Sequence, residues 1–142
     1  DNEMIVIGKK LGLKTIQRDK KLQGAEIPSR LIFDSCLKKM PKNIDGILHI
    51  QANSPNIDIN LIKCALKMMQ FDEIQELLTC DKNYNQYGSL WGITRKRIKK
   101  YNMNRNIHDR KVIKPDCYLL DESVDIHDIK DFRRSLKQLS KR

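Results

Sequence analysis

The sequence lacks the features that mark membrane-spanning proteins, zinc proteins and disulfide-rich secreted proteins. No apolar run approaches the roughly 20 residues that a spanning helix needs, and the opening DNEMIVIGKK does not form a signal peptide. The four cysteines lie at least sixteen residues apart, so none belongs to a Cys-x-x-Cys pair. We therefore expect reduced, mostly buried thiols in a cytoplasmic protein with no membrane partner.

Glycine and aromatic residues are also scarce. The six glycines are scattered, so the chain has no glycine-rich loop of the kind whose backbone amides bind phosphate. Binding of single-stranded nucleic acid needs aromatic rings among the cations, and Tyr101 is the one aromatic residue beside the basic stretch TRKRIKKY. We do not expect nucleic acid as the partner, and a solvated surface is the simpler interpretation of this stretch.

Positive charge is abundant. The formal net charge of +10 favours phosphate-bearing partners in general, without distinguishing a nucleic acid from a nucleotide. The alternative is a lysine-rich surface that serves solvation alone. With 142 residues, 39% of them hydrophobic and 32% charged, the composition is typical of one soluble globular domain that spans 1–142.

Helical and strand patterns alternate along the chain, which predicts the α/β class with a mainly parallel sheet in a three-layer sandwich. The uncharged run GILHIQ is typical of a strand that is buried on both faces. Phe132, Leu136 and Leu139 are expected to face inward from the last helix. The expected helices cover 2–12, 25–40, a segment from about 58, and 128–139, and the expected strands cover 13–18, 46–51, 73–80, 89–94 and 117–121.

Two polar motifs follow expected strands. QANSP comes after GILHI, and the acidic run ESVDIHDIKDF comes after CYLLD. In open α/β sheets ligands bind at the carboxyl ends of the strands. We therefore predict that Gln51 and Asp125 open onto one crevice at a single rim of the sheet.

Each motif has a chemical and a structural interpretation. Magnesium commonly takes one or two carboxylates together with substrate phosphates, so Asp125 could hold a metal–nucleotide. Alternatively, Asp125 and Asp128 cap the terminal helix and meet its positive end. QANSP could equally be a tight strand-to-helix connection in which Pro55 fixes φ and Ser54 makes a local cap.

The order of these motifs resembles the acylneuraminate cytidylyltransferases, which make CMP-activated acidic sugars. DGILHIQANSP looks like the strand and "LQPTSP" turn of that family, YNQYGSLWGITRKRI resembles its "NGAIYITKRE", and ESVDIHDIKDF resembles its "ESVDIDTEEDF". The opening stretch through SCLK looks like the helix, strand ending in arginine, and loop that the family places before its next helix. The resemblance covers most of the chain and implies a Rossmann-like nucleotidyltransferase fold.

The resemblance implies roles for individual residues. Asp125 matches the first aspartate of the "DID" metal motif, as catalytic and Mg²⁺-binding residue, while His127 stands where the second aspartate belongs and Asp128 could substitute for it. Arg18 matches the arginine that approaches the nucleotide, and the partners implied are CTP and an acidic sugar. Three further residues are implied to lie against these ligands: Gln51, Asn53 and Ser54.

The sequence also departs from the family. Its members begin with a strand and a loop of the type "ARGGSKG", and they carry a long insert where this chain has only DKNYNQ. The match therefore implies a fold that is incomplete at the N-terminus, with a homo-oligomer or a partner chain supplying the first unit. The alternative is a non-catalytic binding or assembly module that keeps the fold without the phosphate loop.

Overall fold

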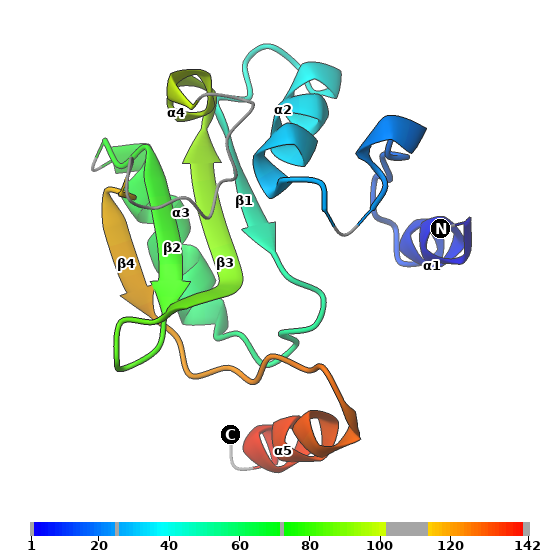
Figure 1. The fold of residues 1–142 in the computed structure, drawn as a ribbon, viewed down its shortest axis with the longest axis vertical. Helices are drawn as coiled ribbons and strands as arrows, with labels where there is room; N and C mark the ends of the chain where they lie inside the picture. The colour runs from blue at the N-terminus through cyan, green and yellow to red at the C-terminus, as the bar shows by residue number, and fades with distance from the viewer. Residues whose placement is uncertain (1, 25, 72, 102–113, 141–142) are drawn as a thin grey trace.

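The structure, a computed structural model, describes residues 2–24, 26–71, 73–101 and 114–140. Its described part is a mixed α/β arrangement in which helices surround one open sheet (Figure 1). The helices are α1 (Asn2–Lys10), α2 (Ser29–Lys39), α3 (Ile59–Phe71), α4 (Arg95–Lys100) and α5 (Ile129–Leu139), with a short 3₁₀ helix η1 (Lys20–Leu22). The strands are β1 (Gly46–Ile50), β2 (Glu76–Cys80), β3 (Gln86–Thr94) and β4 (Cys117–Leu120).

The sheet is less parallel than the sequence predicted. The strand order is β1-β3-β2-β4, and β3 pairs antiparallel with both of its neighbours, while β2 and β4 pair in parallel. The reason is the short connection after β2, where the Asp81 carboxylate accepts the backbone N–H groups of Asn83 and Asn85 at 2.8 and 2.9 Å. A turn this short joins antiparallel strands only. β1, β2 and β4 nevertheless point in one direction, so their carboxyl ends meet at one rim.

Apolar side chains from both faces of the sheet form the core. One cluster joins Phe33 and Leu37 of α2 to Leu78, Trp91 and Ile93 of the strands. The other cluster packs Ala65 of α3 against the strands through Leu77 and Leu90. Successive strand residues point to opposite faces, which is why the neighbours Leu77 and Leu78 belong to different clusters.

A buried ion pair lies at the amino end of β2. Arg97 of α4 donates from Nε to the Glu76 carboxylate at 2.9 Å, and Trp91 Nε1 donates to the same carboxylate at 3.2 Å. The Tyr101 hydroxyl donates there too, and burial together with this carboxylate raises the pKa of Tyr101. Trp91 is a core residue, as expected, whereas the expectation of a fully solvated basic stretch is wrong for Arg97.

The strand predicted over 13–18 is absent, and the burial predicted for the strand GILHIQ on both faces is wrong. Residues 13–18 are not part of the sheet: this segment is tied to α2 instead, because Lys39 Nζ donates to the Gln17 carbonyl at 3.2 Å and to the Asp19 carboxylate at 2.9 Å. β1 is only half-buried, because it pairs with β3 alone among the described strands and so forms an edge. The stop signal at Gly12 is confirmed, since this glycine follows α1 with φ +72°.

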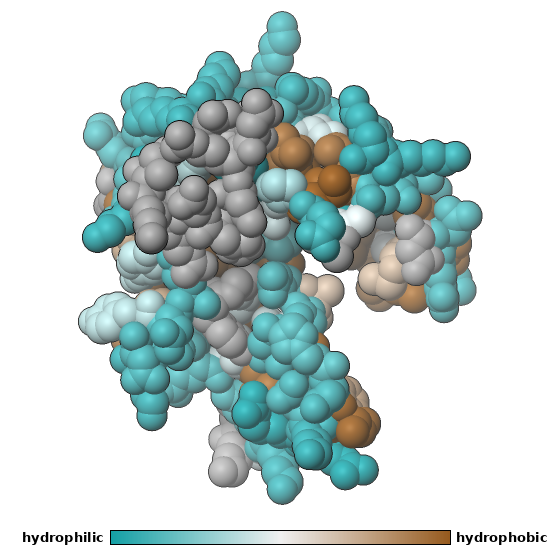
Figure 2. Space-filling model, viewed as in Figure 1, coloured by the Kyte–Doolittle hydropathy of each residue, from teal (hydrophilic) through white to brown (hydrophobic). Residues whose placement is uncertain are grey.

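The last helix is turned the opposite way from the prediction. Phe132, Leu136 and Leu139 are 46%, 50% and 45% exposed, and α5 shows apolar surface in Figure 2. The helix is held to the body by polar groups: Asn56 Nδ2 donates to the Ser135 carbonyl at 2.8 Å and to Gln138 Oε1 at 2.9 Å. These specific bonds override the apolar periodicity of the sequence.

The structure also tests the predictions for the cysteines and for membrane-spanning helices. All four cysteines are free thiols, but only Cys80 is buried, so the expectation of mostly buried thiols is wrong. None of the helices in the described ranges has the length and apolar character needed to cross a bilayer.

Replacing a core residue tests the position of the sheet between its helices. Ile93 is fully buried, so Ile93→Ala should lower the free energy of unfolding by about 2–5 kcal/mol. Ile50→Ala in the edge strand is the matched control and should cost much less, because Ile50 is 43% exposed. Urea unfolding followed by circular dichroism measures both, and equal losses would contradict this placement of the core.

Candidate functional site

The candidate site lies at the rim where β1, β2 and β4 end. The chain leaves β1 through Gln51, whose backbone N–H donates to the Ser89 carbonyl of β3 at 2.9 Å. It leaves β4 through Asp121, whose N–H donates to the Cys80 carbonyl at 3.0 Å. The turn 51–56 and the acidic run 122–132 therefore start at the same rim of the sheet, from β1 and β4, which are its two edge strands.

The two segments touch. The side chain of Asn53 donates from Nδ2 to Oδ1 of Asp125, and the backbone N–H of Ile126 donates to the Asn53 carbonyl at 2.8 Å. A side-chain bond and a backbone bond together fix both the position and the direction of the acidic run. The structure thus brings these two motifs together at one rim, while the crevice expected between Gln51 and Asp125 stays a prediction.

Asp125 is held on its other side by histidine. His127 Nε2 lies 2.9 Å from Asp125 Oδ2, with the His127 side chain 73% exposed and the Asp125 side chain 27% exposed. Both oxygens of this carboxylate therefore have a nitrogen partner. A cation that binds Asp125 has to replace or share the contact with His127, which is the residue that departs from the family pattern.

Asp128 caps α5. Its Oδ1 accepts the backbone N–H groups of Lys130 and Asp131 at 2.7 and 2.9 Å, and its own backbone is extended, as at a helix N-cap. The neighbouring Asp131 accepts the His127 N–H at 3.1 Å. The structural interpretation is confirmed for Asp128, whose metal-binding role stays a prediction.

The turn after β1 is tight, and two of its residues, Ser54 and Asn56, are buried. The Ser54 N–H donates to the Gln51 carbonyl at 3.1 Å, and the Ile57 N–H donates to the Ser54 carbonyl at 3.3 Å, which confirms a compact connection. The Ser54 hydroxyl does not make the expected local cap. It is buried, and its Oγ has no hydrogen-bond partner within the described part of the chain.

Beneath these segments lies a polar network that the sequence reasoning missed. The buried Asp121 carboxylate accepts the hydroxyls of Ser89 and Ser123, both at 2.5 Å, and the Ser123 N–H at 3.0 Å. Thr79 Oγ1 lies 2.8 Å from Ser89 Oγ, which extends the network into β2. The available signal was an acidic residue directly after the strand CYLL, with polar Thr79 and Ser89 inside two other strands.

The buried thiol beside this network is not a nucleophile candidate. Cys80 ends β2, and burial raises the pKa of its thiol, with the negative charge of Asp81 adding to the effect. The thiolate is the reactive form of cysteine. The groups at this rim that can bind or react with a ligand are therefore its carboxylates, amides and hydroxyls.

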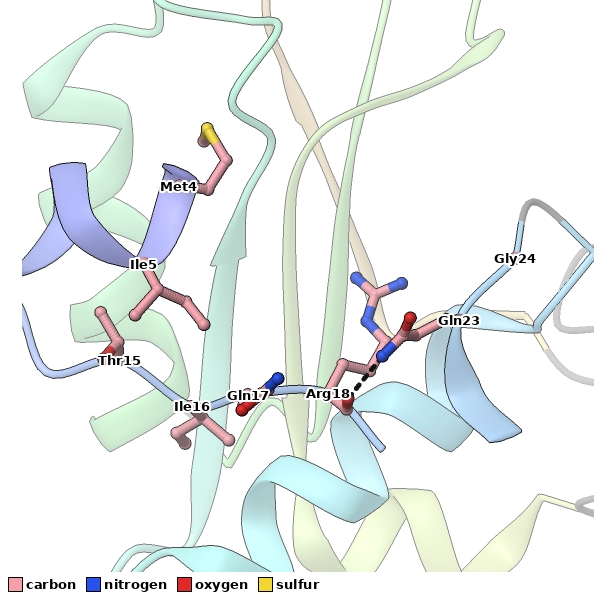
Figure 3. A pocket seen from close by; sticks show the side chains of 8 residues that line it. All are labelled: Met4, Ile5, Thr15, Ile16, Gln17, Arg18, Gln23 and Gly24. Carbon is pink, nitrogen blue, oxygen red and sulfur yellow. Dashed lines mark hydrogen bonds between the residues drawn. The ribbon is translucent and has the colours of Figure 1, made fainter. Parts of the chain in front are cut away.

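Arg18 lies elsewhere. Its side chain is exposed and lines an open hollow of about 520 Å³ with Met4, Thr15 and Gln23 (Figure 3). Its carbonyl accepts Gln23 Nε2 at 2.9 Å. In Figure 1 the segment of α1 and η1 stands apart from the sheet, beyond α2. Among the described residues, Arg18 makes no hydrogen bond or ion pair with Asn53 or Asp125.

One carboxylate of this site is suited to magnesium. Among the described residues, no group of three or more His, Cys, Asp or Glu side chains comes together as a metal site. Asp125 is partly exposed and lies beside the amide of Asn53, so it can supply one oxygen ligand. This fits the mode in which Mg²⁺ takes a single carboxylate and completes its shell with water and phosphate oxygens.

Comparisons with known proteins add no family assignment. A scan against protein-family models found no match to this chain, and a search of curated proteins found no significant relative.

The N-cap of α5 provides a test of the capping role of Asp128. Asp128→Ala should lower the free energy of unfolding by about 0.5–2 kcal/mol, while Asp128→Asn should stay within a few tenths because asparagine caps equally well. Urea unfolding measures both variants. A large loss in Asp128→Asn would show that the charge of Asp128, rather than its cap, stabilises the fold.

Proposed function

We propose that this chain is a nucleotidyltransferase domain of the cytidylyltransferase type, which transfers CMP from CTP to an acidic sugar and releases pyrophosphate. The observation that carries the proposal is the contact of Asn53 with Asp125 at the rim where three strands end in the same direction. The sequence motifs around these two residues are those that resemble the family. The finer fold, a three-layer Rossmann-like sandwich incomplete at its N-terminus, is part of the same proposal.

The site residues divide the work by their chemistry. Asp125 would hold Mg²⁺, and Asn53 keeps the Asp125 carboxylate in place. Gln51 and Ser54, which belong to the same turn, would contact the sugar or the nucleotide, and Arg18 would reach the nucleotide from the separate segment before α2. When bound, the metal supplies positive charge to the phosphate oxygens as pyrophosphate leaves.

In the reaction, a sugar hydroxyl attacks the α-phosphate of CTP, and the bond from that phosphorus to the bridging oxygen of pyrophosphate breaks. Cationic and amide groups that face the phosphate stabilise the charge that gathers on its oxygens. No glycine-rich loop within 1–142 is available for this. We therefore propose that a second copy or a partner chain completes the phosphate site.

A second candidate function is a non-catalytic binding or assembly module. Two observations favour it: His127 occupies the second oxygen of Asp125, and Arg18 lies in a hollow of its own. Both would leave the domain able to bind a ligand at the rim without the groups that drive transfer.

Calorimetric titration with Mg·CTP tests the proposed site. Asp125→Ala should weaken the affinity by about tenfold or more, equivalent to about 1.4 kcal/mol, because it removes the carboxylate that would hold the metal. Glu122→Gln is the matched control, since it removes a nearby exposed acidic charge, and it should bind like wild type. Equal affinities for wild type and Asp125→Ala would remove Asp125 from the site.

A turnover assay separates the two candidate functions. Release of pyrophosphate from CTP in the presence of an acidic sugar, by the full-length encoded chain, supports the transferase. Mg·CTP binding without pyrophosphate release supports the binding module.

A further inference from the structure

We infer that Asp121 is the residue that positions Asp125 and Asn53, by holding the two chain segments of the rim on one buried network. The inference rests on the proposed function for its chemical meaning and on the hydrogen bonds of Asp121 for its geometry. Asp121 is not among the residues that the motifs single out.

The burial of Asp121 is the first part of the argument. Asp121 is 7% exposed. Its carboxylate accepts three hydrogen bonds, from the hydroxyls of Ser89 and Ser123 at 2.5 Å and from the Ser123 backbone N–H at 3.0 Å. Asp121 forms no ion pair with any residue in the described part of the chain. A buried charge without a cation is tolerated only when donors satisfy it. The surrounding hydroxyls are therefore fixed in direction by this carboxylate.

The second part of the argument is the double role of Ser89. Its hydroxyl donates to Asp121, while its backbone carbonyl accepts the N–H of Gln51 at 2.9 Å. One residue of β3 thus holds the first residue of the turn after β1 and the last residue before the acidic run. Thr79 braces Ser89 from β2, at 2.8 Å between the two hydroxyl oxygens.

The third part is the short path from this network to the site. Ser123 is held twice by Asp121, through its hydroxyl and its backbone N–H, and it lies two residues before Asp125. On the other segment, Gln51 lies two residues before Asn53. Asp121 therefore sets the starting point and direction of both segments just before they meet at Asn53 and Asp125.

The acidic residue acts through other residues, so it is a positioning residue and not a catalytic one. Its effect should be local. Loss of the network should weaken the hydrogen bond from the Ile126 N–H to the Asn53 carbonyl. The backbone hydrogen bonds between β1 and β3 should remain intact.

Amide hydrogen exchange measured by NMR tests the inference without any ligand. In Asp121→Ala the Ile126 amide should exchange roughly tenfold to hundredfold faster than in wild type, since hydrogen bonds to a charged group are lost. The β3 amides should change far less. Asp121→Asn should restore most of the Ile126 protection, because hydroxyls can rotate to accept its amide hydrogens.

Two further variants make the outcome decisive. Glu122→Gln is the control for charge and should leave Ile126 unchanged. Ser89→Ala removes one donor to Asp121 and should also speed exchange at Ile126, which decides the matter if Asp121→Ala fails to fold. Unchanged exchange at Ile126, or an equal rise at Ile126 and throughout β3, overturns the positioning role.

Titration of the same variants with Mg·CTP links the network to the site. The affinity should fall in Asp121→Ala and Ser89→Ala, the variants in which the Ile126 amide exchanges faster. In Asp121→Asn both the affinity and the exchange rate should return toward the wild-type values. If wild type does not bind Mg·CTP, the proposed function fails, while the exchange measurements still decide the role of Asp121.

Discussion

The site depends on hydrogen bonds that join two segments far apart in the sequence. The turn after β1 and the run after β4 are separated in the sheet by β3 and β2, yet Asn53 contacts Asp125 and Ile126 directly. A single contact between two loops would be weak, because ordering the chain costs about 1–2 kcal/mol per residue. The buried Asp121 network and the hydrogen bonds of α5 add further contacts to these segments. Together these contacts offset the conformational entropy that is lost when the segments are ordered.

Most of the acidic residues near the C-terminal helix accept hydrogen bonds from hydroxyl or backbone N–H groups and so stabilise the local fold. Asp121 binds hydroxyls under the sheet edge, Asp128 caps α5, and Asp131 accepts the His127 N–H. Asp125, whose side chain is 27% exposed, lies at the rim beside Asn53. The clustering of carboxylates before the last helix thus has a structural cause for most of its members, and a chemical interpretation is left to Asp125.

The exposed apolar residues of α5 follow from the same polar anchoring. Asn56 and Ser135 exchange hydrogen bonds in both directions, and Gln138 also donates to the Glu122 carbonyl at 2.8 Å. With the helix held by these bonds, Phe132 and Leu136 stay about half exposed. The edge of β1 is likewise only half-buried. An exposed apolar helix face and an open edge strand are both surfaces on which another protein segment can pack.

Local signals in the sequence determined most of the elements. Gly12 ended α1, Asp128 began α5, and the apolar runs around Ile47, Leu78 and Leu119 became strands, because capping, turn and burial preferences act over a few residues. The tertiary structure decided what depends on partners distant in sequence. It left residues 13–18 outside the sheet and placed Ser89 and Asp121 together, since neither follows from residues adjacent in the chain. The antiparallel direction of β3 does follow from a local signal, the short connection after β2, which the prediction of a mainly parallel sheet overlooked. The motifs predicted that Gln51 and Asp125 share a rim, but the network that holds them there exists only once three strands have paired.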